Sequence, residues 1–143
     1  MNGHIAMRPN QAICVQLGGI YLKQVDPLIK ILHRPSVAEL MIHSGRYLHY
    51  KPDHASVEVL ACAICYATVN SMTEEQCQSI LNISKSSAML DYRLQCEYAF
   101  QRAGLVSTDD MTVLQAFVLY LVCQPTVLFK HSNNPTTSLL PVS

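Results

Sequence analysis

With ten basic and ten acidic residues among 143, the chain has a formal net charge of zero, so it lacks the basic excess of a free-standing nucleic-acid-binding domain. The basic residues also occur singly, without a stripe or cluster. Only 14% of the residues are charged, against about 25% in a typical globular chain. The length therefore predicts one domain, and the composition predicts that much of its surface is covered by other protein.

The first predicted helix runs from Gln11 to Gln24, after a flexible tail at residues 1–10. Its apolar positions fit the helical period only loosely, and the Gly18-Gly19 pair is expected to weaken it by about 1 kcal/mol per glycine relative to alanine. The Asp26-Pro27 pair is predicted to end this helix and to start a short turn over Leu28–Leu32.

Two capping boxes predict where further helices begin, because the two side chains of such a box satisfy each other's free backbone amides. Ser36 and Glu39 open a helix that is expected to reach Tyr47. The box at Thr73–Gln76 opens another, which is expected to reach Leu81.

The segment Ala55–Asn70, with Asp53 as its expected cap, is apolar on nearly every face and carries Glu58 as its only charge. A helix without a polar face is typical of the centre of a bundle. We therefore expect this helix to form the core.

Two more helices complete the predicted bundle. The first covers Ser84–Ala103, with Ser84 as its cap. The second is capped by Ser107 or Thr108 and has the Asp109-Asp110 pair in its first turn, where acidic side chains are favourable. Its apolar stripe is expected to consist of Met111, Leu114, Phe117, Val118, Leu121 and Val122.

No segment alternates with the two-residue period of a strand. The predicted fold class is therefore all-α, an irregular bundle of about six helices in residues 11–123, followed by a disordered tail at residues 124–143. The apolar stretch Val59–Val69 is too short for a membrane span of about 20 residues, and residues 1–20 lack the pattern of a secretory signal. These features indicate an intracellular protein that is not inserted in a membrane.

Cys62 and Cys65 have the spacing of a redox motif or of half a zinc site, but a redox motif follows a strand and a zinc site needs a second pair. Core packing is the predicted role of all six cysteines: Cys14, Cys62, Cys65, Cys77, Cys96 and Cys123.

Other candidate side chains are explained by ordinary structural roles. Helix ends and surface account for a group of histidines with two nearby acids: His33, His43, His49, His54, Glu39 and Asp53. Capping and the helix dipole account for Glu74, Glu75, Asp109 and Asp110. Core packing is favoured over a ligand pocket for Tyr66, Met72, Met89, Tyr92 and Tyr98. No catalytic, cofactor-binding or metal-binding residue is predicted, and no enzymatic activity.

The stretch Tyr21–Pro35 has an aromatic residue, a Gln-Val-Asp-Pro break, an Ile-Leu-His sequence and a proline. It resembles the opening of the fungal-specific transcription factor domain, the middle homology region of binuclear zinc cluster regulators. The stretch Thr108–Leu121, with its Leu-Gln-Ala-Phe-Val-Leu-Tyr-Leu sequence, looks like a second segment of that domain. Met72–Cys77 is similar to the loop and acidic helix between them, so the resemblance covers about residues 20–122.

This resemblance implies a nuclear transcription regulator of a fungal metabolic or secondary-metabolite pathway. The Cys-x2-Cys-x6-Cys rhythm of the zinc cluster is absent, and the helices of that domain normally continue well beyond this point. We therefore expect a truncated domain without its own DNA-binding module, which acts through protein contacts. The helices have more apolar surface than the chain itself can bury. Self-association or a protein partner is therefore predicted. The alternative is a non-functional truncated remnant or a generic helical interaction module.

Overall fold

The computed structural model describes residues 10–105 and 108–124, and all regular structure within them is helical. The predicted all-α bundle of about six helices is confirmed. The predicted tails at residues 1–10 and 124–143 lie outside the described residues, except for Asn10 and Gln124. In chain order the elements are α1 (Gln11–Ile20), the π-helical η1 (Tyr21–Val25), α2 (Arg34–Met41), α3 (Ala55–Ser71), α4 (Glu74–Gln76), the π-helical η2 (Cys77–Leu81), α5 (Lys85–Ala103) and α6 (Met111–Val122).

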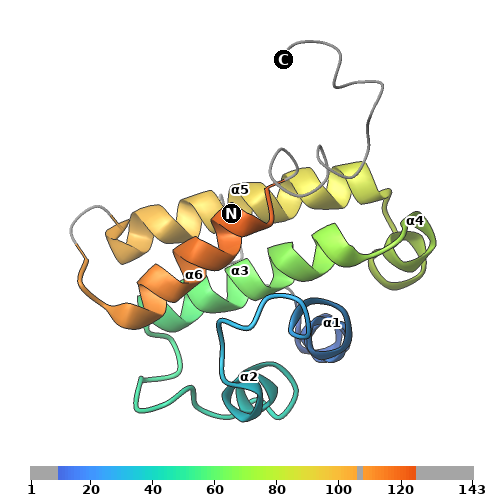
Figure 1. Cartoon of the computed structure of the whole chain (residues 1–143). Helices are drawn as coiled ribbons and strands as arrows, with labels where there is room; N and C mark the ends of the chain where they lie inside the picture. The colour runs from blue at the N-terminus through green and yellow to red at the C-terminus, as the bar shows by residue number, and fades with distance from the viewer. Residues whose placement is uncertain (1–9, 106–107, 125–143) are drawn as a thin grey trace.

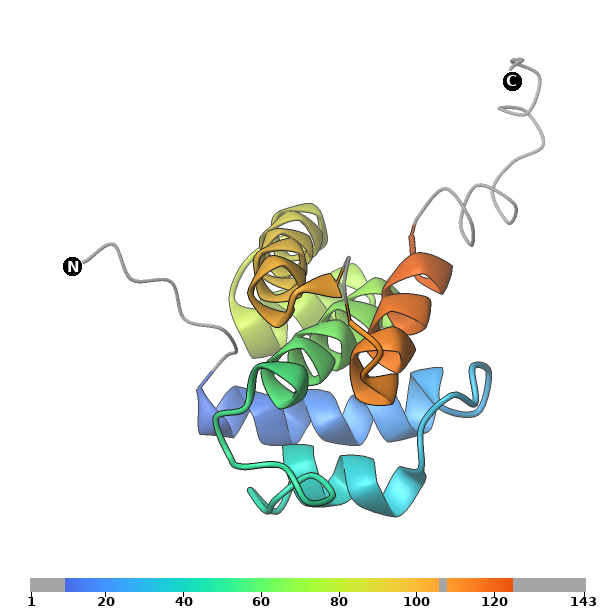
Figure 2. The ribbon, with the colours of Figure 1, turned by 90° about the vertical axis from the view of Figure 1, so that its left-hand side faces the viewer.

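Helix α3 lies at the centre, with α5 and α6 on one side of it and α1 and α2 on the other (Figures 1 and 2). Every residue from Ser56 to Asn70 except Glu58 is buried, so the prediction that this helix forms the core is confirmed. Burying one large apolar side chain contributes about 1.5–3 kcal/mol, and Leu60 and Ile64 are completely buried here. Helices α5 and α6 are therefore held chiefly by their contacts with α3, whereas α2 packs mainly on α1.

Glycine has a specific function in α1, where the sequence suggested only a weak point. A Cβ atom on Gly18 would lie 2.6 Å from Cβ of Met41 and 3.2 Å from Cγ1 of Ile42. Gly18 therefore lets the backbone of α1 approach the end of α2 closely. The neighbouring Gly19 has no heavy atom within 4 Å of its Cβ position, so the two glycines are not equivalent.

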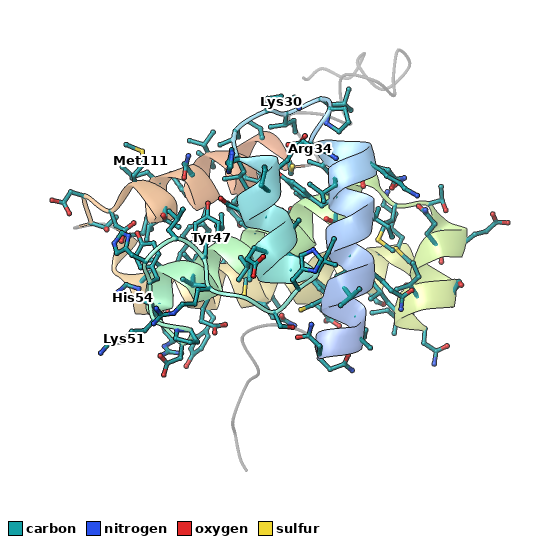
Figure 3. The ribbon with its side chains drawn as sticks, turned by 90° about the horizontal axis from the view of Figure 1, so that it is seen from below. Lys30, Arg34, Tyr47, Lys51, His54 and Met111 are labelled. Carbon is teal, nitrogen blue, oxygen red and sulfur yellow. The ribbon has the colours of Figure 1, made fainter. Side chains whose placement is uncertain are left out.

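The predicted break at Asp26-Pro27 is confirmed, because η1 ends at Val25 and the amide of Asp26 bonds to the carbonyl of Tyr21. The side chain of Asp26 is fully buried, and its Oδ2 accepts from Lys30 Nζ at 2.9 Å and from Arg34 Nη1 at 2.8 Å. Figure 3 labels these two cations, which come from the loop before α2 and from the first residue of α2. Burial disfavours the charged carboxyl, but these two cations outweigh that effect and hold the pKa of Asp26 below its ordinary value. The predicted short turn over Leu28–Leu32 is wrong, since the chain turns earlier, over Asp26–Leu28.

The capping box predicted at Ser36 is also wrong. Helix α2 begins two residues earlier, at Arg34, because Pro35 fits the first turn of a helix and Ser36 Oγ is instead 2.9 Å from Nδ1 of His33. The helix ends at Met41 and not at Tyr47, because the chain leaves the helical conformation at Ser44, which has a positive φ of 57°.

Of the other predicted helix caps, two are confirmed and two are wrong. The box at Thr73–Gln76 and the cap at Ser84 are confirmed by their hydrogen bonds. The cap of α3 is His54 and not Asp53, since Nδ1 of His54 accepts from the amide of Ser56 at 3.0 Å. In α6 the cap is Asp110, not Thr108 or the undescribed Ser107, because Asp110 Oδ1 accepts from the amide of Thr112 at 2.8 Å.

Candidate functional site

Helix α6 presents a continuous apolar surface to the solvent. Much of the predicted apolar stripe lies in solvent: Met111 is 66% exposed, Val118 45% and Leu121 44%. The buried side of α6, which packs on α3, consists of Thr112, Val113, Ala116 and Leu119. The cause is that α6 has no charged residue and is apolar on most faces, so periodicity could not decide which face is buried. We call the outward set Met111, Leu114, Val118 and Leu121 the α6 face.

Aromatic contacts fix the orientation of α6, so that the α6 face must point outward. Phe100 of α5 packs edge-on against Phe117 and Tyr120 of α6, with ring centroids 5.6 and 5.5 Å apart. Tyr120 also lies 5.3 Å from the ring of Tyr66 in α3, and its hydroxyl donates to Glu97 of α5 at 2.7 Å. Rotating α6 to bury the α6 face would break all of these contacts.

A polar network fixes the start of the same helix. The carboxylate of Asp110 accepts from Tyr50 Oη at 2.7 Å and from Ser56 Oγ at 2.9 Å, in addition to capping α6. Burial disfavours the charged form, but these hydrogen bonds favour it more strongly and hold the pKa of Asp110 below its ordinary value. Asp110 therefore ties α6 to the start of α3 and to the loop before it.

Replacing Asp110 with alanine is expected to lower the free energy of unfolding by about 2–3 kcal/mol, since it removes a helix cap and two further hydrogen bonds. Asparagine keeps an acceptor for the cap but cannot satisfy Tyr50 and Ser56 equally well, so Asp110→Asn should lose about half as much. Urea unfolding of the three proteins at neutral pH measures both values.

The same carboxylate gives a pH dependence with a defined sign. The pKa of Asp110 in the folded state lies below the ordinary value of 3.8. Its contribution to the free energy of unfolding is therefore complete above about pH 5, and it is lost as the pH falls below 3.8 through the folded pKa. Asp26 acts in the same direction. The unfolding free energy of the unmodified chain should therefore fall more steeply from pH 5 to 3 than that of Asp110→Asn, and equal slopes would contradict this assignment.

The cysteines behave as core residues, as predicted. All six are buried and none is in a disulfide bond, and they come from α1, α3, η2, α5 and the end of α6. A hydrogen bond with Cys14, together with burial, raises the pKa of Cys65 well above its ordinary value, and burial raises that of Cys123 to about 11. These thiols are therefore poor nucleophiles and poor metal ligands at neutral pH. Across residues 10–105 and 108–124, no group of three or more potential ligands could hold a metal ion.

The histidines and acidic residues lie at helix ends and on the surface, as predicted, but Asp109 and Asp110 precede the first turn of α6 and do not lie within it. His49 stacks on Tyr50 with ring centroids 4.9 Å apart, and the ring of His54 lies tilted against Tyr50 with centroids 4.8 Å apart. Glu74 accepts from Gln78 Nε2 and from the amide of Lys85, which joins α4 to the start of α5. The exposed histidines and acids of the predicted group are His33, His43, His49, His54, Glu39, Asp53, Glu74, Glu75 and Asp109.

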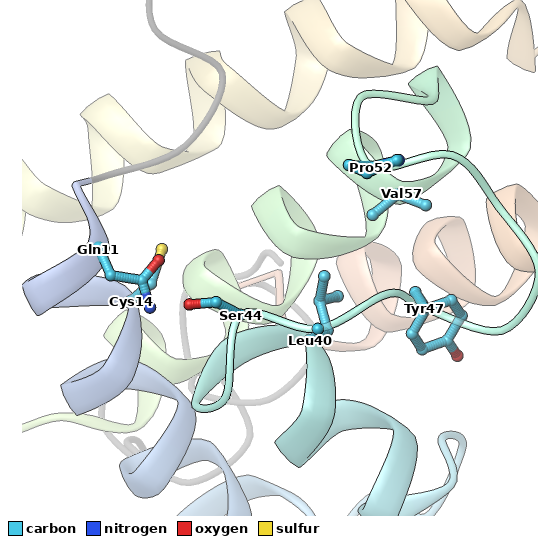
Figure 4. A pocket seen from close by; sticks show the side chains of 8 residues that line it. Gln11, Cys14, Leu40, Ser44, Tyr47, Pro52 and Val57 are labelled. Atoms are coloured by element: carbon cyan, nitrogen blue, oxygen red, sulfur yellow. The ribbon is translucent and has the colours of Figure 1, made fainter.

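Of the aromatic and methionine candidates, Tyr66, Met72 and Tyr92 are core residues, but Tyr98 is 43% exposed on α5. A pocket of about 280 Å³ lies between α1, α2 and the loop that leads to α3 (Figure 4). It brings together no set of charged groups. Its lining residues are Gln11, Cys14, Leu40, Ser44, Gly45, Tyr47, Pro52 and Val57. In the described part of the chain, none of the helices is both long and apolar enough to cross a membrane.

Comparison with known proteins shows to which proteins the chain is related. The chain is 48% identical over 115 residues to the C6 finger domain transcription factor adaR of Aspergillus niger, an alignment that covers 80% of the chain and 15% of that protein. It is 51% identical over 110 residues to the C6 finger domain transcription factor nscR of Aspergillus fumigatus, covering 76% and 14%. The chain is a homologue of one segment of the C6 finger domain transcription factors. A further relative, transcription factor vrtR2 of Penicillium aethiopicum, is 51% identical over 112 residues, covering 78% and 13%.

The relationship to fungal zinc cluster regulators that the sequence motifs predicted is thus confirmed. The chain spans about 15% of the length of the C6 finger relatives that it matches. No family profile and no solved structure matches it. The structure explains part of the motif: its aromatic residue, Tyr21, begins η1, its acid, Asp26, directly follows η1, and both are completely buried.

Proposed function

We propose that this chain is a regulatory segment in the control of transcription, which acts in the nucleus of a fungus through protein contacts. The observation that supports this proposal is its identity of about one half with C6 finger transcription factors over most of its length. A metabolic pathway, such as secondary metabolism, is the proposed target of that control.

Two properties favour protein contacts over base reading by this segment. The net charge is zero, whereas phosphate backbones are bound by clusters of Lys and Arg. The α6 face offers apolar side chains in a row, and contiguous exposed apolar surface marks sites of protein association. These two properties support protein binding by this segment over DNA binding.

The proposal is tested by expressing the fluorescently tagged chain in a filamentous fungus, with and without a full-length C6 finger relative and a reporter gene under its control. We expect the chain to concentrate in the nucleus when the full-length factor is present and to change the reporter output. A chain that stays evenly distributed and leaves the reporter unchanged in both strains would contradict the proposal, and would favour a non-functional remnant.

A further inference from the structure

Cys14 of α1 lines the pocket between α1, α2 and the loop that leads to α3. Figure 4 shows the side chains of Gln11, Cys14 and Ser44 gathered at one end of this pocket. Because Cys14 is only 4% exposed, a molecule from the solvent reaches its sulfur through the pocket. The pocket measures about 280 Å³, and a water molecule occupies about 30 Å³ of the liquid, so a molecule of a few heavy atoms fits inside.

A second thiol lies in contact with Cys14. Cys65, in the middle of α3, is completely buried and is hydrogen-bonded to Cys14. This hydrogen bond and burial both raise the pKa of Cys65 well above its ordinary value, so Cys65 keeps its proton. An S–H group that keeps its proton can donate to Cys14 Sγ and thereby favours negative charge on that sulfur. The pair therefore combines a sulfur that a small molecule can reach with a proton donor beside it.

The other cysteines differ from this pair. Cys123 lines a second pocket, of about 380 Å³, between η1 and the ends of α3 and α6. Burial, and not a hydrogen-bonded thiol as in Cys65, raises the pKa of Cys123 to about 11. The remaining cysteines line neither of these two pockets: Cys62, Cys77 and Cys96. Access and a thiol partner thus coincide at Cys14.

We propose that Cys14 and Cys65 form a reversible oxidation site, at which a hydroperoxide that enters the pocket converts the two thiols to a disulfide between α1 and α3. In the first step Cys14 Sγ attacks one oxygen of the hydroperoxide, so that an S–O bond forms and the O–O bond breaks. The departing oxygen takes the proton of Cys14 and leaves as an alcohol, or as water when the oxidant is hydrogen peroxide. Cys14 is thereby oxidised to a sulfenic acid, and the hydroperoxide is reduced.

In the second step Cys65 Sγ attacks Cys14 Sγ. The S–S bond forms, the S–O bond breaks, and the hydroxide leaves as water with the proton of Cys65. Cys65 is a weak nucleophile while it is protonated, but it is held against the sulfur that it attacks. The two sulfurs need only approach from hydrogen-bond contact to the bonding distance of about 2.05 Å. The site goes beyond the proposed function, because its chemistry needs no protein partner.

The test is treatment of the purified, folded and reduced chain with hydrogen peroxide, after which the remaining thiols are blocked with N-ethylmaleimide in urea. Mass spectrometry of the digested protein should find Cys14 linked to Cys65, and dithiothreitol should reverse the link. Cys14→Ser and Cys65→Ser should each lack the link, whereas the control Cys77→Ser should keep it. In Cys65→Ser the first step still occurs, so dimedone should trap Cys14 as a sulfenic acid.

The pocket as the route of the oxidant has its own pair of variants. Gln11 is exposed and lines the pocket, so Gln11→Trp should cover its mouth and slow formation of the disulfide several-fold. Gln16 is exposed on the same helix but is not among the residues that line the pocket, so Gln16→Trp should leave the rate unchanged. Equal rates in the two variants would overturn entry through the pocket.

Six thiols that all stay reduced, or a disulfide that joins other cysteines, would overturn the proposal as a whole. Mapping of the unmodified chain decides this even where circular dichroism shows that a serine variant fails to fold. These measurements are independent of the cellular experiment. A chain that changes the reporter but forms no link refutes the oxidation site alone, and a link without any effect on the reporter refutes the proposed function alone.

Discussion

Ile64→Ala is expected to lower the free energy of unfolding by about 2–5 kcal/mol, which is a large part of the stability of a domain of this size. Ile64 is completely buried in the middle of α3, where α5 and α6 pack on one side and α1 and η1 on the other. The alanine leaves a cavity that these elements cannot all close. Urea or thermal unfolding, followed by circular dichroism, measures the loss.

Two controls make the result specific to packing. Ile64→Val removes one methylene group and should cost only about 0.5–1.5 kcal/mol. Leu28→Ala removes a similar number of atoms from a side chain that is 82% exposed and should change stability by less than about 0.5 kcal/mol. If Ile64→Ala and Leu28→Ala had equal effects, α3 could not be the core.

Gly18→Ala and Gly19→Ala are expected to change stability in opposite directions, although the two residues are neighbours in α1. Alanine at Gly19 meets open space and should stabilise the helix by up to about 1 kcal/mol. Alanine at Gly18 places its Cβ 2.6 Å from Cβ of Met41, so α1 and α2 must move apart at a cost of about 1–3 kcal/mol. Paired denaturant titrations of the two variants check the signs.

Met41 Cβ is attached directly to the backbone and cannot swing aside as the end of a flexible chain would. The clash at Gly18 should therefore persist in Gly18→Ala combined with Met41→Ala, which retains Cβ. If that double variant regained the stability of Met41→Ala alone, the close approach of the two helices would not be the cause.

The order and class of the helices could be predicted from the sequence because each depends on local signals. α3 was recognised because it is apolar all round, and the cap at Ser84 because its hydroxyl reaches an amide three residues away. Both are decided within one or two turns of chain.

The errors arose where contacts between residues far apart in the sequence determine the local structure. Asp110 caps α6, and not Thr108, because its carboxylate also binds Tyr50 and Ser56, which lie 60 and 54 residues earlier. The face of α6 that packs on α3 could not be found from the sequence, because the large side chains of the α6 face dominate the helical pattern while α3 accepts the row around Ala116. The sequence of a helix without charges on any face does not indicate which side is buried. The shape of the helix on which it packs, here α3, determines that side.

The burial of α3 has a consequence for how the chain is made. The segment Ala55–Ser71 leaves the ribosome before α5 and α6, the helices that cover one of its sides. Until those helices have been synthesised, the nascent chain exposes one of its most apolar segments, which is a preferred target for chaperones and for aggregation. Ribosome profiling of chaperone contacts should therefore find occupancy that begins once α3 has emerged and ends after α6 has followed it.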